Sequence, residues 1–445
     1  MIHKFLLPKP SYLRLLCILL LCSVSVKAQD NNGYKFPPKE LADLVTAKPT
    51  PTVSISSKGD WMLLLSRNTS TTTIAELSEP EYRLAGLRFN PQTNGPSRAS
   101  YINDLTLRKI AAEAVDIPVS GLPKDAKISY ISWSPDGRKI AFTNTTESQI
   151  ELYVLNIETA AAQKVSTIPL NAILGKPFQW LPDNNAFVVK AIPTERGAAP
   201  HISRVPSGPT VQENLGKKAQ AATYQDLLKK PSDEKLFEYY TTSQAVFLSI
   251  DGSNHPIGKM GMIATALPSP DGKYVLLETL HRPFSYLVTV NRFPQRTEIY
   301  ATDGTFTKQL NDSPLLENIP LGRDAAPNGQ RQHDWRNDTP ATIYWVEAKD
   351  GGDPKKAAAI RDVVYSLDAP FSGSPKELYQ STLRFGGVTW GNEHVALFSE
   401  RWYTTRRSIT KLVDPSKPEN AKILFDISSE DRYGNPGTPE LAKNK

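Results

Sequence analysis

Cysteine is almost absent from this chain of 445 residues: its two cysteines, Cys17 and Cys22, both lie within the first 28 residues. The rest of the chain can therefore form no disulfide, supply no thiolate to a metal and use no thiol as a nucleophile. Buried apolar surface must hold the fold together instead. With 39% hydrophobic and 22% charged residues, the composition allows a large core and excludes global disorder.

A strong excess of charge of one sign is also missing. The formal net charge is +6, from 52 Lys and Arg against 46 Asp and Glu. Four of the cations (Lys4, Lys9, Arg14 and Lys27) lie in residues 1–28, which contain no acid, so the remainder carries 48 cations against 46 acids, a net +2. This balance gives no support to a nucleic-acid partner or to binding at an anionic membrane surface.

No apolar run reaches the roughly 20 residues that a membrane-spanning helix needs. The longest begins at Leu15 and continues for about 12 residues after a basic start, and Val26-Lys27-Ala28 offers a cleavage site before Gln29. We interpret residues 1–28 as a signal peptide, with a retained anchor as the alternative. The sequence thus predicts an exported bacterial protein, periplasmic or extracellular, with no membrane anchor once the signal is removed.

Motifs for self-contained catalysis are missing as well. There is no Gly-x-Ser-x-Gly nucleophile elbow, no phosphate-binding loop and no dinucleotide fingerprint. No two of the six histidines have the spacing of metal ligands. The segment Asp350-Gly-Gly-Asp353 lacks the alternating acids of a calcium loop, so we interpret it as a turn. The sequence predicts no catalytic residue, no metal and no cofactor.

A repeated turn-and-strand motif is what the chain does contain. An aromatic or apolar residue is followed by a turn with an acid and then by a short apolar run, which is typical of a buried strand. Four copies carry tryptophan and two weaker ones do not: Trp133-Ser-Pro-Asp136, Trp180-Leu-Pro-Asp183, Trp335-Arg-Asn-Asp338, Trp390-Gly-Asn-Glu393, Pro268-Ser-Pro-Asp271 and Ser57-Lys-Gly-Asp60. Another alternating segment follows each copy, which gives hairpin-rich units of roughly 40–50 residues.

These units predict an all-β fold, a β-propeller of four-stranded blades over residues 29–445. We expect about six to seven blades, the seventh arising in the long interval between Trp180 and Pro268. In that interval we predict strands at 236–240 and 245–250 and a helix at about 219–228. Since no closing strand is evident near Lys445, we expect an incomplete ring.

Three arginines are candidates for binding a substrate carboxylate. Arg282, Arg406 and Arg407 lie in short segments rich in aromatic residues, and a guanidinium can bind a carboxylate with two parallel hydrogen bonds. Aromatic walls strengthen such a pair by excluding water. The alternative is that each arginine pairs with an Asp or Glu of this chain and serves only the fold.

Several segments, in order along the chain, resemble the glutamyl endopeptidase branch of the prolyl oligopeptidase family of serine peptidases. They are residues 37–45, 84–94, 208–213, 224–228, 282–286, 344–353 and 423–431. The resemblance implies an N-terminal β-propeller that restricts access of peptides to a C-terminal α/β-hydrolase domain carrying Ser, Asp and His, and cleavage after acidic residues. The present chain matches only the propeller, and no catalytic residue can be carried over to it.

The function that we predict is therefore the substrate-gating propeller of an exported serine endopeptidase, inactive by itself, with peptides as partners through the hydrolase domain that this sequence lacks. Two alternatives stay open. One is a stand-alone propeller that binds peptides or a protein. The other is a lyase or glycosidase with its site in the central channel, which the small number of histidines disfavours.

Overall fold

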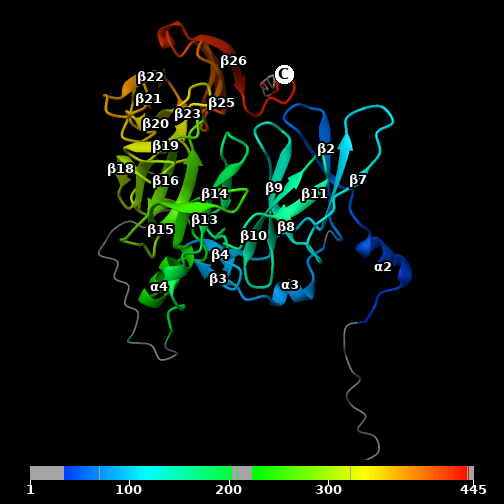
Figure 1. Ribbon diagram of the computed structural model, residues 1–445. Coiled ribbons are helices and arrows are strands. Elements are labelled where there is room, and N and C mark those ends of the chain that lie inside the picture. Colours follow the sequence, from blue (N-terminus) through cyan, green and yellow to red (C-terminus); the bar gives the residue numbers. More distant parts are fainter. Residues whose placement is uncertain are drawn as a thin grey trace, which may run out of the picture. The chain divides into compact units, whose positions relative to one another are not determined.

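The computed structural model describes residues 35–69, 71–202, 208, 223–320, 322–437 and 439, so the predicted signal peptide, 1–28, lies outside the described residues. The chain divides into two compact units, one of residues 1–48 and 69–71 and one of residues 49–68 and 72–445. In the described part of the first unit, helix α2 (Lys39–Thr46) has no buried residue. The second unit contains all the described strands (Figure 1).

Two four-stranded antiparallel sheets open the second unit. The first has the order β1 (Thr52–Ile55), β2 (Trp61–Ser66), β6 (Asp104–Lys109) and β7 (Ile117–Pro118). The second consists of β8 (Ile128–Trp133), β9 (Lys139–Thr145), β10 (Ile150–Asn156) and β11 (Ala161–Lys164). Between β2 and β6 the chain forms helix α3 (Ile74–Ser78) and a small sheet of β3 (Tyr82–Leu84), β4 (Leu87–Asn90) and β5 (Gly95–Pro96).

A seven-stranded sheet follows, and it consists of two four-stranded meanders that share one strand. Its order is β12 (Phe178–Trp180), β13 (Ala186–Ala191), β14 (Ser243–Ser249), β15 (Asn254–Pro268), β16 (Tyr274–Leu280), β17 (Gln295–Ala301) and β18 (Phe306–Ser313). The first half of β15 pairs with β14, and its second half, from Met262 onward, pairs with β16.

Two more four-stranded antiparallel sheets complete the described fold. One contains β19 (Gln330–Trp335), β20 (Thr342–Ala348), β21 (Asp362–Asp368) and β22 (Lys376–Ser381). The other contains β23 (Arg384–Asn392), β24 (Val395–Trp402), β25 (Arg407–Val413) and β26 (Lys422–Ser428). The predicted all-β architecture of four-stranded propeller sheets is confirmed, since every four-stranded unit is an antiparallel meander, with α3 and β3–β5 inserted between β2 and β6 in the first one.

The turn chemistry that the sequence suggested explains where the strands begin. The Asp136 carboxylate accepts hydrogen bonds from the Ser134 hydroxyl (2.6 Å) and the Arg138 amide (3.0 Å), and Gly137 supplies the positive φ of +70°. Asp271 does the same with Ser269 and Lys273 (2.6 and 3.1 Å). Each turn thus closes on its own side chain and directs the chain into the next buried strand.

The four repeat tryptophans occupy equivalent places, as expected. Each lies at or near the end of the first strand of its sheet, paired with an apolar residue of the next strand. Three of them donate an indole hydrogen bond to the first strand of the preceding meander: Trp133 to the Ser54 hydroxyl (2.9 Å), Trp180 to the Ser132 carbonyl (3.1 Å) and Trp335 to the Leu267 carbonyl (3.0 Å). These three tryptophans therefore fasten their sheets to the meander before them, whereas the buried Trp390 indole nitrogen has no hydrogen-bond partner in the described residues.

Replacing Trp335 by phenylalanine should lower the free energy of unfolding by about 1–3 kcal/mol, because the half-buried Leu267 carbonyl loses its donor beside the buried indole. Urea unfolding followed by circular dichroism measures the change. Trp61→Phe is the control, since no hydrogen bond from the Trp61 indole to another sheet occurs in the described residues. Equal losses in the two variants would contradict the fastening role.

One predicted strand is wrong. Residues 236–240 belong to helix α4 (Pro231–Thr241), and the interval between Trp180 and Pro268 contains no additional sheet in its described part. Pro231 begins the helix, and Leu236, Phe237, Tyr240 and Thr241 are buried at helical spacing. The strand at 245–250 is confirmed as β14.

The helix predicted at 219–228 falls partly outside the described residues, and residues 223–228 are not helical. Three short 3₁₀ turns complete the described elements: η1 (Thr194–Arg196), η2 (Val290–Arg292) and η3 (Pro418–Asn420). None of the described helices has the length and apolar character needed to cross a bilayer.

Candidate functional site

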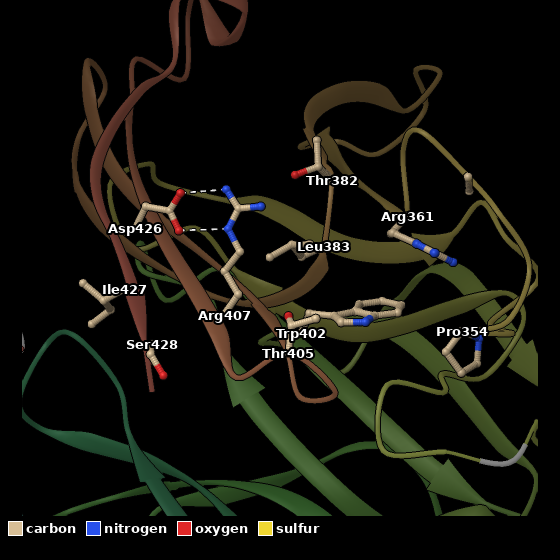
Figure 2. Close-up of a pocket in the computed structure, with 11 residues that line it drawn as sticks. Pro354, Arg361, Thr382, Leu383, Trp402, Thr405, Arg407, Asp426, Ile427 and Ser428 are labelled. Atoms are coloured by element: carbon tan, nitrogen blue, oxygen red, sulfur yellow. Dashed lines mark hydrogen bonds and ion pairs between the residues drawn. The ribbon is translucent and has the colours of Figure 1, made fainter. Parts of the chain in front are cut away.

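Two adjoining hollows, of about 690 and 670 Å³, lie over the sheet of β23–β26. They share Trp402 and Arg407 as lining residues. Figure 2 shows the first hollow, in which the Trp402 indole lies near the Arg361 and Arg407 side chains. The Arg361 guanidinium stacks on Trp402 at 4.5 Å from the ring centre. An aromatic wall with cations on it is suited to binding an anionic or peptide ligand.

Of the three arginines predicted from the sequence, Arg407 lines both hollows. Its guanidinium forms two parallel hydrogen bonds with the Asp426 carboxylate, at 2.9 and 2.6 Å (Figure 2). These bonds, with the Arg407 charge, hold the pKa of Asp426 below its ordinary value. Arg407 thus lies where a substrate could bind, but two of its guanidinium nitrogens already donate to Asp426.

Arg406 and Arg282 lie elsewhere and are also paired. Arg406 bonds Glu430 at 2.9 Å and stacks on the ring of the neighbouring Tyr403. Arg282 binds two carboxylates of helix α4, Glu234 at 2.5 Å and Glu238 at 2.9 Å. Neither arginine is among the lining residues of the two hollows. All three arginines therefore pair with an Asp or Glu of this chain, which is the alternative that the sequence left open.

The second hollow is strongly cationic. Five arginines line it, with one aspartate, Asp324: they are Arg323, Arg331, Arg384, Arg401 and Arg407. Sequence reasoning missed Arg331 and Arg384, because they lie in β19 and β23, far apart in the chain and with no local motif. Of the five arginines, only Arg407 is among the candidates that the sequence predicted.

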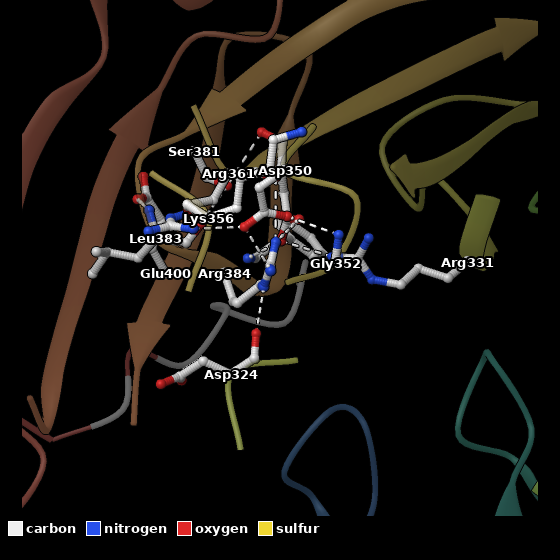
Figure 3. A network of polar contacts seen from close by, with 12 residues as sticks. Asp324, Arg331, Asp350, Gly352, Lys356, Arg361, Ser381, Leu383, Arg384 and Glu400 are labelled. Carbon is white, nitrogen blue, oxygen red and sulfur yellow. Dashed lines mark hydrogen bonds and ion pairs between the residues drawn. The ribbon is translucent and has the colours of Figure 1, made fainter. Parts of the chain in front are cut away.

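A buried network of arginines and aspartates forms the wall behind this hollow (Figure 3). Arg384, only 6% exposed, reaches Asp350 at 2.8 Å and Asp362 at 3.0 Å. Asp350 also binds Arg361 (2.7 Å), and Asp362 also binds Arg331 (2.7 Å). Both carboxylates are almost fully buried, at 1% and 0% exposed. Buried ions of this kind persist only when they are paired and hydrogen-bonded.

The electrostatics of the network follow from these contacts. Burial alone would raise the pKa of Asp350, but hydrogen bonds from Arg384 and Arg361 hold that pKa below its ordinary value. The Asp350 carboxylate also accepts the Gly352 amide at 2.9 Å, so the segment Asp350-Gly-Gly-Asp353 is a turn, as predicted. Asp350 is consequently ionised and committed to the fold.

A third buried carboxylate, that of Glu400, positions the loop beside the first hollow. Glu400, which is fully buried, pairs with Lys411 at 2.7 Å and accepts the amides of Thr382 and Leu383 at 2.9 and 3.0 Å. Burial raises the pKa of Glu400, but the bonds from Lys411 and Tyr379 outweigh it and lower that pKa. Since a general acid needs a raised pKa, Glu400 is suited to holding the loop and not to proton transfer.

Within the residues that the structure describes, no group of three or more His, Cys, Asp and Glu is arranged to hold a metal ion. The arrangement offers cations, aromatic walls and hydrogen-bond donors. It can bind an anion, and it contains no activated nucleophile in the described residues.

Two plant proteins match most of the chain. Each is named "Probable glutamyl endopeptidase, chloroplastic", one from Oryza sativa subsp. japonica (39% identity over 427 residues, 92% of this chain) and one from Arabidopsis thaliana (39% over 426 residues, 92% of this chain). The chain is thus similar in sequence to two proteins named as glutamyl endopeptidases. It spans just under half of their length, 45% and 44%.

Other comparisons are less specific. The β-propeller domain of the Trilobed protease from Pyrococcus furiosus aligns with a TM-score of 0.39 and 10% identity, covering 84% of this chain and 85% of that one. No protein-family model matches the chain. The similarity to glutamyl endopeptidases thus lies in the sequence of the part that folds into these four-stranded sheets.

Proposed function

We propose that this chain is the propeller portion of an exported serine endopeptidase of the prolyl oligopeptidase family, related to glutamyl endopeptidase, and that it controls which peptides reach the catalytic domain. The observation that carries the proposal is the 39% identity over 92% of a chain that spans under half of its relatives. A propeller without a nucleophile elbow suits a gating role and not catalysis.

Export is part of the proposal and rests on residues 1–28 of this sequence, with their basic start, apolar run and cleavage site. The plant relatives are named chloroplastic. The exported chain would reach the periplasm or the cell exterior. Because it has no cysteine after residue 28, its folding there would not depend on disulfide formation.

Among the candidate substrate contacts we propose Arg407 first, because it lines both hollows. A substrate carboxylate would have to exchange with Asp426 at that guanidinium. Arg282 and Arg406 would need the same exchange with Glu234 and Glu430, at sites outside the hollows. In our proposal their main role is to hold helix α4 and the turn before β25.

The chain alone is expected to have no peptidase activity, because it has no Gly-x-Ser-x-Gly motif. Incubating the purified chain with Glu-containing peptides and following products by mass spectrometry tests this. Full-length glutamyl endopeptidase serves as the positive control. Turnover by the chain that a serine-directed inhibitor abolishes would overturn the proposal.

A stand-alone peptide-binding module is the second candidate, and the cationic hollow favours it because all five arginines belong to this chain. The two functions are separated by adding a catalytic α/β-hydrolase domain of a glutamyl endopeptidase. Gating predicts that the chain changes which peptide lengths are cleaved, whereas a stand-alone module leaves the cleavage pattern unchanged.

A further inference from the structure

The second hollow carries more positive charge than the chain neutralises. Around the hollow and the network behind it are six arginines and four aspartates, a net charge of +2: Arg323, Arg331, Arg361, Arg384, Arg401 and Arg407 against Asp324, Asp350, Asp362 and Asp426. Arg323 and Arg401 form no ion pair with a carboxylate in the part of the chain that the structure describes. A concave surface with surplus cations attracts anions.

Arg331 adds a buried donor that nothing satisfies. Its Nη2 binds Asp362 at 2.7 Å, but its Nη1 is buried and has no hydrogen-bond partner in the described residues. The side chain is only 14% exposed and lines the hollow. Burial is the main cause that lowers the pKa of Arg331, and the nearby Arg384 charge lowers it further. A buried donor without an acceptor is costly, so an acceptor oxygen of a ligand would be stabilised at this position.

The one acid on the wall does not supply that acceptor. The Asp324 carboxylate accepts the amides of Tyr403 and Thr404 at 2.6 and 3.0 Å and the Thr404 hydroxyl at 2.7 Å. It therefore fixes the turn between β24 and β25, and its oxygens face that turn. The Arg384 Nε instead binds the Asp324 main-chain carbonyl, at 2.7 Å.

The rest of the lining suits a peptide better than a bare inorganic ion. Tyr403 and Trp402 provide aromatic surface, and Ala326, Pro327 and Phe385 provide apolar surface. The hollow also continues into the first one through Trp402 and Arg407, which leaves room for chain on both sides of a bound carboxylate. Apolar walls with a few converging polar groups are typical of ligand sites.

We propose that this hollow binds the carboxylate of an acidic peptide side chain, held by Arg331 Nη1 and by the Arg401 and Arg323 guanidinium groups. The inference deepens the proposed function, on which it rests for the kind of ligand, and it places recognition in residues that the sequence did not single out. Arg331, fixed by Asp362, supplies orientation, and the two exposed arginines supply charge.

Isothermal titration calorimetry of the purified chain with the blocked peptide acetyl-Ala-Glu-Ala-amide, and with the matched Gln peptide, tests the proposal without any need for catalysis. We expect the Glu peptide to bind at least tenfold more tightly than the Gln peptide, a difference of about 1.4 kcal/mol, and to weaken as salt is added. Arg401→Gln and Arg323→Gln should each remove most of this preference. Arg138→Gln, at an exposed arginine in the turn before β9, should leave it unchanged.

Arg331→Lys tests the buried donor. Lysine keeps a positive charge beside Asp362 but lacks the guanidinium group and its Nη1 donor. Arg336→Lys is its matched control, since Arg336 is similarly buried, at 11% exposed, is paired with the buried Asp338 at 2.7 Å, and lines neither hollow. Selective loss of Glu binding in Arg331→Lys supports the proposal.

Equal binding of the Glu and Gln peptides, no binding of either, or equal loss in the two lysine variants would overturn it. Inorganic phosphate that binds as tightly as the peptide, with the same dependence on Arg401, would overturn the peptide as ligand and leave a simple anion site. If the hydrolase domain is gated by the chain while neither peptide binds, the proposed function stands and this inference fails. If the chain binds the Glu peptide selectively but does not gate the hydrolase domain, this inference stands and the proposed function fails.

Discussion

Replacing Arg384 by methionine is expected to lower the free energy of unfolding by about 3–5 kcal/mol. The reason is that Asp350 and Asp362 are almost fully buried and both use the Arg384 guanidinium. Once it is removed, each aspartate keeps one arginine, and the Asp324 carbonyl loses its donor. Methionine fills similar volume, so the loss reports the charges and not a cavity.

Urea unfolding of the variant and the parent chain at pH 7 measures this loss. Arg138→Met is the control, because that side chain is 63% exposed and lies 3.8 Å from Glu158, and its change should stay below about 1 kcal/mol. Adding Asp350→Asn to Arg384→Met should restore part of the stability by removing a poorly paired charge. A loss in Arg384→Met no larger than in Arg138→Met would show that the network does not stabilise the sheet.

Replacing Lys190 by methionine is expected to change how stability depends on pH. Lys190 lies in β13, is 3% exposed and binds only two carbonyl oxygens that the structure records, those of Leu174 (2.8 Å) and Ala264 (3.2 Å). Burial lowers its pKa from 10.5 to about 7. Between these two pH values the unfolded chain holds a proton that the folded chain has released, so the parent gains stability as the pH rises, by about 1.4 kcal/mol per unit at most.

Methionine cannot titrate, so Lys190→Met removes this gain. The stability of the variant minus that of the parent should therefore fall by about 1.4 kcal/mol for each pH unit between pH 7.5 and 9.5. Urea unfolding at pH 7.5, 8.5 and 9.5 gives the difference, and Lys273→Met, at a side chain that is 77% exposed, provides the comparison. A difference that stays constant over these three values would mean that Lys190 remains charged in the folded chain.

Local chemistry is what made most strands predictable. At Asp136 and Asp271 the turn is closed by side chains within the motif itself, so the sequence contains the whole cause of the reversal. The segment 236–240 was misassigned for a different reason. Its apolar and aromatic residues suit a strand, and only their burial against other parts of the fold, at helical spacing after Pro231, distinguishes the helix.

The candidate site was predictable only in part, for the same reason. Arg407 and its aromatic neighbours stand together in the sequence, and the structure places Arg407 in both hollows. Arg331 and Arg384 meet only because β19 and β23 belong to neighbouring sheets and share Asp362. Some of these guanidinium groups are hydrogen-bonded within the chain at every nitrogen, and others keep an unpaired N–H donor. This difference depends on the three-dimensional pairing, and no spacing in the sequence encodes it.

Strand β15 gives the middle of the molecule a particular mechanical character. Because one continuous strand is hydrogen-bonded to β14 along its first half and to β16 along its second, the two meanders cannot slide past each other or separate without breaking a backbone ladder. At other boundaries the structure records, for the residues it describes, side-chain contacts and isolated backbone bridges, such as Ser120 to Ala161 between the first two sheets, and no continuous ladder. The two meanders share strand β15 itself. Gly258, with a φ of +64°, lies against the Tyr300 ring near the place where the strand changes partners. The boundary at β15 therefore has more backbone hydrogen bonds than the boundaries joined by isolated bridges, and we expect neighbouring sheets to separate at those other boundaries first.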